Sequence, residues 1–217
     1  GRAPGGHCGR LRRRQPSGGD RSAPGLCRGV AASGGQLHRR LHEPRRMAAG
    51  KEWARVIQHG EFRIIIMDAP CNENSAAYIS ELKALGVTDV VRTCELTYSP
   101  ESFVAEGIKV HEMTFPDGAA PPEETIHEWF NLIHSRYTSK DPTQKGTVAV
   151  HCVAGLGRAP VMAAVALIEM TAIDPMDAVE KIRFVQKGAI NAKQLKFLQT
   201  YKRINKKSGP CLGCTLL

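Results

Sequence analysis

One stretch of the sequence carries residues that could do covalent chemistry. Residues 148–158 read Val-Ala-Val-His-Cys-Val-Ala-Gly-Leu-Gly-Arg, an apolar run followed by a cysteine, a glycine-containing loop and an arginine. Backbone N–H groups in a loop that opens a helix can point together at an anion, and the helix dipole favours negative charge there. Cys152 begins this loop, where such a field stabilises the nucleophilic thiolate. The pattern predicts an oxyanion site with a cysteine nucleophile.

The neighbours of Cys152 suit a phosphate group. Arg158 can return over the loop and hold two phosphate oxygens with its planar guanidinium, which a lysine cannot do in the same geometry. We expect His151 to hydrogen-bond around the cysteine backbone and to support the thiolate. The loop residues expected to bind phosphate together with Arg158 are Val153, Ala154, Gly155, Leu156 and Gly157.

Displacement at phosphorus also needs a proton donor for the leaving oxygen. Asp117 lies in Phe-Pro-Asp-Gly, after a predicted strand and before a Pro-rich stretch, on a loop that could swing over the site. An isolated Asp-Gly is more often a surface turn. The cysteine loop elsewhere in the chain favours the general acid instead.

These residues must be positioned by strands and helices. From residue 51 onward, segments whose apolar residues recur about every second position alternate with segments of helical periodicity. This alternation predicts an α/β fold, with a central, mostly parallel sheet flanked by helices. The predicted strands are residues 62–67, 87–91, 108–113 and 147–151. The predicted helices run from an Asn72 or Asn74 cap to Gly86, from Pro122, from Arg158, from an Asp174 cap and from an Asn191–Gln194 capping box.

Packing follows from the same periods. We expect the helix from Arg158 to be central, because it is apolar on most sides. We expect the aromatic residues of the helix after Pro122 to be core, and the helix capped by Asp174 to point four side chains inward: Met176, Val179, Ile182 and Phe184.

The charge is confined to one end of the chain. Residues 1–46 hold 11 arginines and only two acids, Asp20 and Glu43, so they carry the whole net charge of +9. This Gly/Arg-rich segment has no hydrophobic periodicity and is predicted to be disordered. The segment could be an Arg-rich arm that binds nucleic acid or anionic lipid, or a leader without a role in function. We favour the leader and expect no nucleic-acid partner. The folded domain is predicted to span residues 47–207.

Other classes are disfavoured by composition. No stretch reaches the roughly 18 apolar residues that span a bilayer, which excludes a transmembrane protein. No apolar signal segment opens the chain, so the seven cysteines indicate a reducing compartment rather than a disulfide framework. Cys8, Cys27 and Cys71 lack metal-ligand pairing and are interpreted as structural or incidental.

The last residues, 208–217, form a predicted flexible tail ending in Cys-Thr-Leu-Leu. This pattern predicts geranylgeranylation of Cys214, and Cys211 is a candidate for palmitoylation. One prenyl chain anchors weakly, so a basic patch supplies the second signal toward an anionic membrane. That patch is Lys202, Arg203, Lys206 and Lys207.

Taken together, three motifs carry a resemblance. The run from His151 to Arg158, Asp117-Gly-x-x-Pro-Pro and Gly188-Ala-x-Asn-x-x-Gln194 resemble the protein tyrosine phosphatase superfamily. Continued through Ala159-Pro160, the run is similar to the phosphatases of regenerating liver, over about residues 53–217. The resemblance implies a dual-specificity-phosphatase-like fold and hydrolysis of phosphate monoesters on phosphotyrosine proteins, without metal or cofactor. Cys152 would be the nucleophile, Arg158 the phosphate clamp and Asp117 the general acid.

The resemblance also implies regulation and partners. More active relatives outside this group usually carry Ser or Thr after the arginine, and Ala159 here implies slow hydrolysis of the phosphocysteine. It implies a second role as a pseudo-phosphatase-like module that binds the CBS-pair domains of CNNM-type magnesium transporters. Prenylation would place the protein on the cytoplasmic faces of plasma and endosomal membranes, and in the cytosol if unprenylated.

Cys94 follows a strand predicted to be parallel to the one ending at Cys152, so both sulfurs should lie at the carboxyl edge of the sheet. A small buried hydrophobe is the common fate of such a cysteine. The resemblance favours a redox partner that forms a disulfide with Cys152.

Two rival functions stay open at this point. A binding module would keep the fold and act through a partner surface. A rhodanese-like sulfurtransferase or an arsenate reductase also uses a loop cysteine, although Asp117 disfavours both. The sequence leaves the physiological substrate and the oligomeric state open.

Overall fold

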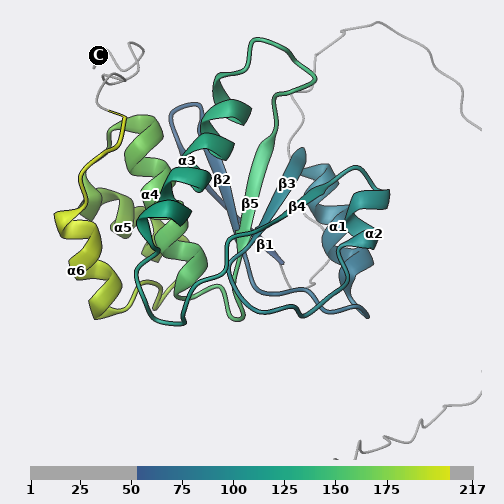
Figure 1. Ribbon diagram of the computed structural model, residues 1–217, viewed down its shortest axis with the longest axis horizontal. Helices are drawn as coiled ribbons and strands as arrows, with labels where there is room; N and C mark the ends of the chain where they lie inside the picture. Colours follow the sequence, from purple (N-terminus) through teal and green to yellow (C-terminus); the bar gives the residue numbers. More distant parts are fainter. Residues whose placement is uncertain (1–52, 206–217) are drawn as a thin grey trace, which may run out of the picture. The chain divides into compact units, whose positions relative to one another are not determined.

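The computed structural model describes residues 53–205, which build a five-stranded sheet between two helical layers (Figure 1). The strand order is β1-β2-β5-β3-β4; β1 runs antiparallel to β2, and the other neighbours are parallel. This confirms the mostly parallel sheet. The strands are β1 (Ala54–His59), β2 (Phe62–Met67), β3 (Val87–Arg92), β4 (Lys109–Glu112) and β5 (Thr147–His151).

Four of these strands were predicted, and β1 was missed. β1 lies at the edge of the sheet and reads Ala-Arg-Val-Ile-Gln-His, with only Ala54 and Ile57 buried. An edge strand buries fewer positions than a central one, so its hydrophobic pattern is weak. The central strand β2, by contrast, is buried from Ile64 to Met67 because helices cover both faces of the sheet.

Alternate residues of each strand serve two separate cores. Ile64 and Ile66 of β2 face one core, and Ile65 and Met67 face the other. The first core is covered by α3 (Glu123–Thr138), α4 (Arg158–Thr171), α5 (Pro175–Val185) and α6 (Ala192–Thr200). The second is covered by α1 (Ser75–Ala84) and α2 (Glu101–Ala105) (Figure 1).

The helices match the predicted ones, with one addition and one error. α4 is central, since its residues 158–170 are all buried, and Ile126, Trp129 and Ile133 of α3 are core. α2 was missed because its five residues make little more than one turn.

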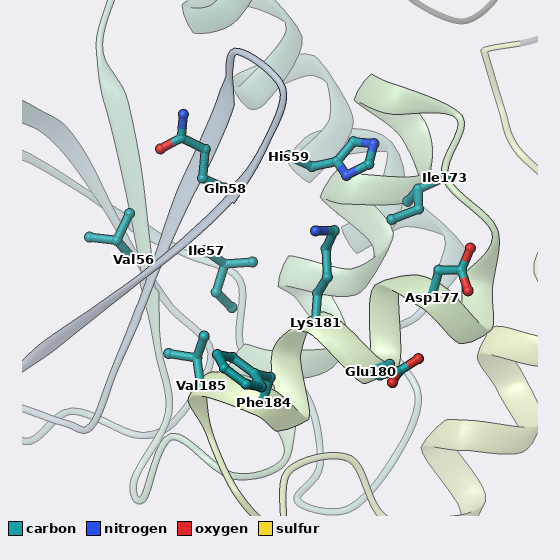
Figure 2. Close-up of a pocket in the computed structure, with 10 residues that line it drawn as sticks. All are labelled: Val56, Ile57, Gln58, His59, Ile173, Asp177, Glu180, Lys181, Phe184 and Val185. Atoms are coloured by element: carbon teal, nitrogen blue, oxygen red, sulfur yellow. The ribbon is translucent and has the colours of Figure 1, made fainter. Parts of the chain in front are cut away.

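The inward face predicted for α5 was partly wrong. Val179 and Ile182 are buried, but Met176 and Phe184 are 42% and 87% exposed. Phe184 lies instead at a groove of about 500 Å³ between α5 and β1 (Figure 2). An apolar residue next to the buried stripe need not belong to it, because periodicity does not fix how wide the covered face is.

Some predictions fall outside the described residues. They are the leader over residues 1–46, the domain start at Met47, Lys206 and Lys207, and the tail cysteines Cys211 and Cys214. Among residues 53–205, none of the helices has the length and apolar character needed to cross a bilayer.

A buried carboxylate on β3 joins this strand to β4 and α3. Asp89 of β3 has no exposed surface; its oxygens accept hydrogen bonds from Arg136 Nε of α3 (2.6 Å) and His111 Nε2 of β4 (2.8 Å). Thr88 Oγ1 donates a further one at 2.6 Å. Burial raises the pKa of Asp89, but these hydrogen bonds outweigh it and hold the pKa well below its ordinary value.

This carboxylate should make stability depend on pH. Because the pKa of Asp89 is lower in the folded than in the unfolded state, its contribution is complete above about pH 5 and is lost as the pH falls below that. We expect Asp89→Asn to lower the free energy of unfolding by about 3 kcal/mol at pH 7, since it leaves Arg136 without its buried partner. The loss should shrink on acidification. Urea unfolding between pH 7 and 3 measures both, because the unfolded Asp89 carboxyl gains its proton mainly below pH 4.

The exposed Asp177→Asn serves as the control and should change the unfolding free energy by less than about 1 kcal/mol. A constant difference between Asp89→Asn and the parent chain across this pH range would contradict the account.

Candidate active site

The carboxyl ends of the central strands gather the chemistry-bearing residues. Cys152 directly follows β5, and Cys94 lies two residues beyond β3, whose Arg92 pairs with His151 of β5. Both cysteines are buried and carry free thiols. The structure thus places both sulfurs at the same edge of the sheet, where parallel α/β folds bind their ligands.

The loop from Cys152 to Gly157, here called the phosphate loop, has its carbonyl groups held from outside. The hydrogen bonds run from Ala69 N to Val153 O (3.1 Å), from Gln186 Nε2 to Gly155 O (3.2 Å) and from Ile190 N to Leu156 O (2.8 Å). None of the amides of residues 153–157 donates to another backbone group of the described chain. Because the carbonyls are turned outward, those amides are available to an anion at the start of α4.

Gly155 lets the loop take this shape. Its φ of +67° is a backbone conformation that favours glycine, and a Cβ there would lie 3.1 Å from the carbonyl oxygen of Met67. Gly155 therefore permits both the turn and the close approach to the end of β2.

Backbone carbonyls hold the Arg158 side chain in place. Its side chain is 3% exposed, and one guanidinium nitrogen donates to the carbonyls of Thr93 and Phe115, each at 3.2 Å. Nε lies 3.2 Å from Asp117 Oδ1 but out of line for a hydrogen bond, so this buried donor has no aligned acceptor. A phosphate oxygen beside the loop would supply one.

Asp117 is brought to the same place from another part of the chain. Its carboxylate is exposed and pairs with Arg158 across 3.2 Å. A Cβ built on Gly157 would lie 4.0 Å from Asp117 Oδ1, which shows how near the carboxylate stands to the phosphate loop. The Asp117 carboxylate and the Arg158 guanidinium can thus reach the same ligand.

His151 is held in a buried polar cluster. Its Nε2 lies 3.0 Å from the Tyr98 hydroxyl, and its Nδ1 lies 3.9 Å from Cys94 Sγ. Burial and the nearby Arg92 cation lower the pKa of His151 to about 4, opposed by a hydrogen bond with the Cys152 backbone. His151 is therefore neutral near pH 7, and it contacts the backbone of Cys152 rather than adding a positive charge beside the sulfur.

Cys94 and Ala159 complete the surroundings of Cys152. Burial raises the pKa of the Cys94 thiol; the Arg158 cation opposes this, and the neighbouring Cys152 adds to it. Ala159 is fully buried and brings no hydroxyl to the start of α4. Within residues 53–205, no three His, Cys, Asp or Glu side chains cluster so as to hold a metal ion.

Sequence reasoning missed the residues that support this site from a distance. Tyr98 and the carbonyls of Thr93 and Phe115 carry no local pattern, because their partners lie more than 40 positions away. Asn191 and Gln194 were expected as a helix cap, which is confirmed. Their contact with the Asp117 loop was not expected.

Comparison with known proteins agrees with this geometry. Residues 56–207 match a family model described as the Swiss Army Knife protein, DSP-PTPase phosphatase domain. A probable protein tyrosine phosphatase type IVA A from Dictyostelium discoideum is 44% identical over 158 residues, which cover 73% of this chain and 92% of the relative. The protein tyrosine phosphatase PRL-1 of Trypanosoma cruzi is 42% identical over 160 residues, covering 72% and 89%.

A solved structure shows the same arrangement. A putative protein tyrosine phosphatase from Leishmania major superposes with a TM-score of 0.61 at 37% identity, covering 69% of this chain and 99% of that structure. Fold and site thus define a cysteine-based protein tyrosine phosphatase of the dual-specificity type. Within that class, the chain belongs to the PRL, or type IVA, family.

The buried His151 yields a prediction on protonation. Its imidazole should stay neutral from pH 8 to 5 and gain a proton only near pH 4, because burial and Arg92 disfavour the charged form. Nuclear magnetic resonance of ¹⁵N-labelled histidine in the full chain reads this directly. A His151 signal that gains its proton near pH 6.5, the ordinary value for a histidine, would contradict the assignment.

Proposed function

We propose that the chain hydrolyses phosphate monoesters on phosphoproteins through a phosphocysteine on Cys152. The observation that carries the proposal is that a buried cysteine begins a loop whose carbonyls are bound from outside, and that the loop ends at a buried Arg158 whose Nε has no hydrogen-bond partner. Phosphotyrosine is the proposed substrate residue, as the names of the relatives suggest for those proteins.

In the first half-reaction, the Cys152 thiolate attacks phosphorus as the bond from phosphorus to the leaving oxygen breaks. Asp117 gives its proton to that oxygen, and Arg158 with the loop amides holds the remaining phosphate oxygens. In the second half-reaction, water attacks the phosphocysteine and gives its proton to the Asp117 carboxylate. Inorganic phosphate leaves, and the thiolate is restored.

The second half-reaction is proposed to be slow. Ala159 follows Arg158 and is fully buried, so no hydroxyl at this position can assist departure of the Cys152 sulfur. Formation of the intermediate uses the phosphate loop, Arg158 and Asp117, which are all present. The phosphocysteine should therefore accumulate during turnover.

Replacing Ala159 with serine tests this step. We expect Ala159→Ser to raise the steady-state kcat about 5- to 30-fold, as one transition-state hydrogen bond would, and to leave the rate of the initial product burst unchanged. Rapid-quench kinetics of the reduced full chain with an aryl phosphate separates the two rates. Ala166→Ser, another fully buried alanine of α4, is the matched control and should not raise kcat.

An unchanged kcat in Ala159→Ser, with the fold retained, would show that the missing hydroxyl does not limit turnover.

Redox control through Cys94 is part of the proposal. Cys94 and Cys152 are buried at one sheet edge, and Cys152 lies near enough to help raise the pKa of the Cys94 thiol. A disulfide between them would block the nucleophile reversibly and protect it from further oxidation.

A second candidate function is a binding module with little turnover. Val153 and Leu156 of the phosphate loop are 56% and 41% exposed, an apolar rim around the site that a protein partner could cover. The proposed partner is a CBS-domain magnesium transporter of the CNNM type. A Cys152→Ser chain that keeps the full cellular effect would favour this role over catalysis.

Membrane attachment is proposed through the tail. The last described residues leave the fold beside α4, where the buried Glu169 carboxylate accepts hydrogen bonds from Tyr201 OH (2.7 Å) and Ile204 N (2.8 Å). Lys202 is exposed, whereas Arg203 donates to the Glu169 carbonyl and is partly committed to the fold. Geranylgeranylated Cys214 and the basic residues would hold the chain on the cytoplasmic faces of plasma and endosomal membranes.

Attachment is tested by fractionating cells that express the full chain. Wild type should pellet with membranes, Cys214→Ser should become soluble because the prenyl acceptor is gone, and Cys211→Ser should still pellet. Intact-mass measurement should show a geranylgeranyl adduct that changes to farnesyl in Leu217→Ser. An unmodified wild-type mass would contradict the proposal.

A further inference from the structure

The connection between α5 and α6, residues 186–191, contacts both loops of the active site. Toward the phosphate loop, Gln186 Nε2 donates to Gly155 O (3.2 Å) and Ile190 N donates to Leu156 O (2.8 Å). Toward the loop of Asp117, Asn191 Nδ2 donates to Gly118 O at 3.1 Å.

The side-chain amides of Asn191 and Gln194 each make two contacts, one within the cap of α6 and one with the Asp117 loop. Asn191 Oδ1 accepts from Gln194 N (2.9 Å) and Gln194 Oε1 accepts from Asn191 N (3.2 Å), which is the capping box. The side-chain nitrogen of each residue takes no part in the capping box and instead donates to a carbonyl of the Asp117 loop. Asn191 Nδ2 reaches Gly118 O, and Gln194 Nε2 reaches Ala119 O at 3.1 Å.

Two features of the backbone allow this contact. Gly118 has a φ of +68°, and a Cβ there would lie 3.3 Å from Asn191 Nδ2, so glycine permits the close approach. Ile190, although β-branched and buried, has a φ of +65°. Such a conformation costs about 1–3 kcal/mol and persists only when its surroundings impose it.

Hydrogen bonds on both sides of Ile190 hold this backbone conformation. Arg183 of α5 donates from Nε to Ala189 O (3.0 Å) and from a terminal nitrogen to Ile190 O (2.9 Å). The Ile190 N–H is meanwhile bound to the phosphate loop. The strained residue thus turns the chain between the phosphate loop and the Asn191 side chain.

We infer that Asn191 and Gln194 are positioning residues for the general acid: they hold the Asp117 loop against the phosphate loop, with the α5–α6 connection as a common support. The inference rests on the proposed function, because it needs Asp117 to be the proton donor. It assigns the capping box of α6 a second task in addition to helix stability.

Replacing Asn191 with serine separates the two tasks. Serine caps a helix about as well as asparagine, so α6 should be retained, but serine has no amide to hold Gly118 O. A mispositioned acid should slow substrates with a poor leaving group most, since these need the proton. We expect kcat/KM of Asn191→Ser to fall about 5- to 10-fold with an alkyl-substituted phenyl phosphate and less than about twofold with a nitrophenyl phosphate.

Asp117→Asn provides the reference, and Asp174→Ser provides the matched control. Asp117→Asn should show the same leaving-group dependence, and the double variant with Asn191→Ser should be no slower than Asp117→Asn alone. Asp174 caps α5 by accepting from Met176 N (2.8 Å), so Asp174→Ser changes a helix cap without touching the Asp117 loop and should leave kcat/KM unchanged. Thermal unfolding of each variant reports retention of the fold.

The outcomes separate the two levels of the account. If Asn191→Ser slows both substrates equally and adds to the effect of Asp117→Asn, the contact is structural and the inference is overturned. If Asp117→Asn itself shows no leaving-group dependence, the assignment of Asp117 as the acid fails, and the positioning role fails with it.

Discussion

The active site depends on where the carbonyl groups of the phosphate loop go. Loop amides can converge on an anion only if the carbonyls between them point outward and find partners there. Ala69, which follows β2, and Gln186 and Ile190, which lie in the α5–α6 connection, supply those partners. Gly155 supplies the conformation that the turn needs. The sheet, the α5–α6 connection and the start of α4 are thus all required before the loop can bind phosphate.

The same principle applies to the charged side chains. Arg158 is anchored by two carbonyls, so little conformational freedom remains to be lost on binding. Its Nε has no aligned hydrogen-bond acceptor and lies 3.2 Å from Asp117 Oδ1. His151 is buried and neutral near pH 7, so it adds no positive charge beside Cys152.

Much of this could be predicted from the sequence, because the informative residues are close together in it. Cys152, its loop and Arg158 lie within seven positions, and buried strands and helix caps leave local patterns, so β2, β5 and the capping box of α6 were predicted correctly. Contacts between distant segments leave no such pattern. The hydrogen bond from Tyr98 to His151 and that from Asn191 to Gly118 join residues 53 and 73 positions apart. The exposure of Phe184 likewise depends on how α5 lies against β1, which periodicity does not specify.

The central claim is that Cys152, set in this loop, accepts the phosphoryl group. The most direct test mixes the reduced full chain with a ³²P-labelled aryl phosphate, quenches in acid within milliseconds and locates the label by peptide mapping. The account predicts close to one equivalent of label on the peptide that contains Cys152, and none in Cys152→Ser. Label on another residue, or release of phosphate by Cys152→Ser at the parent rate, would contradict it.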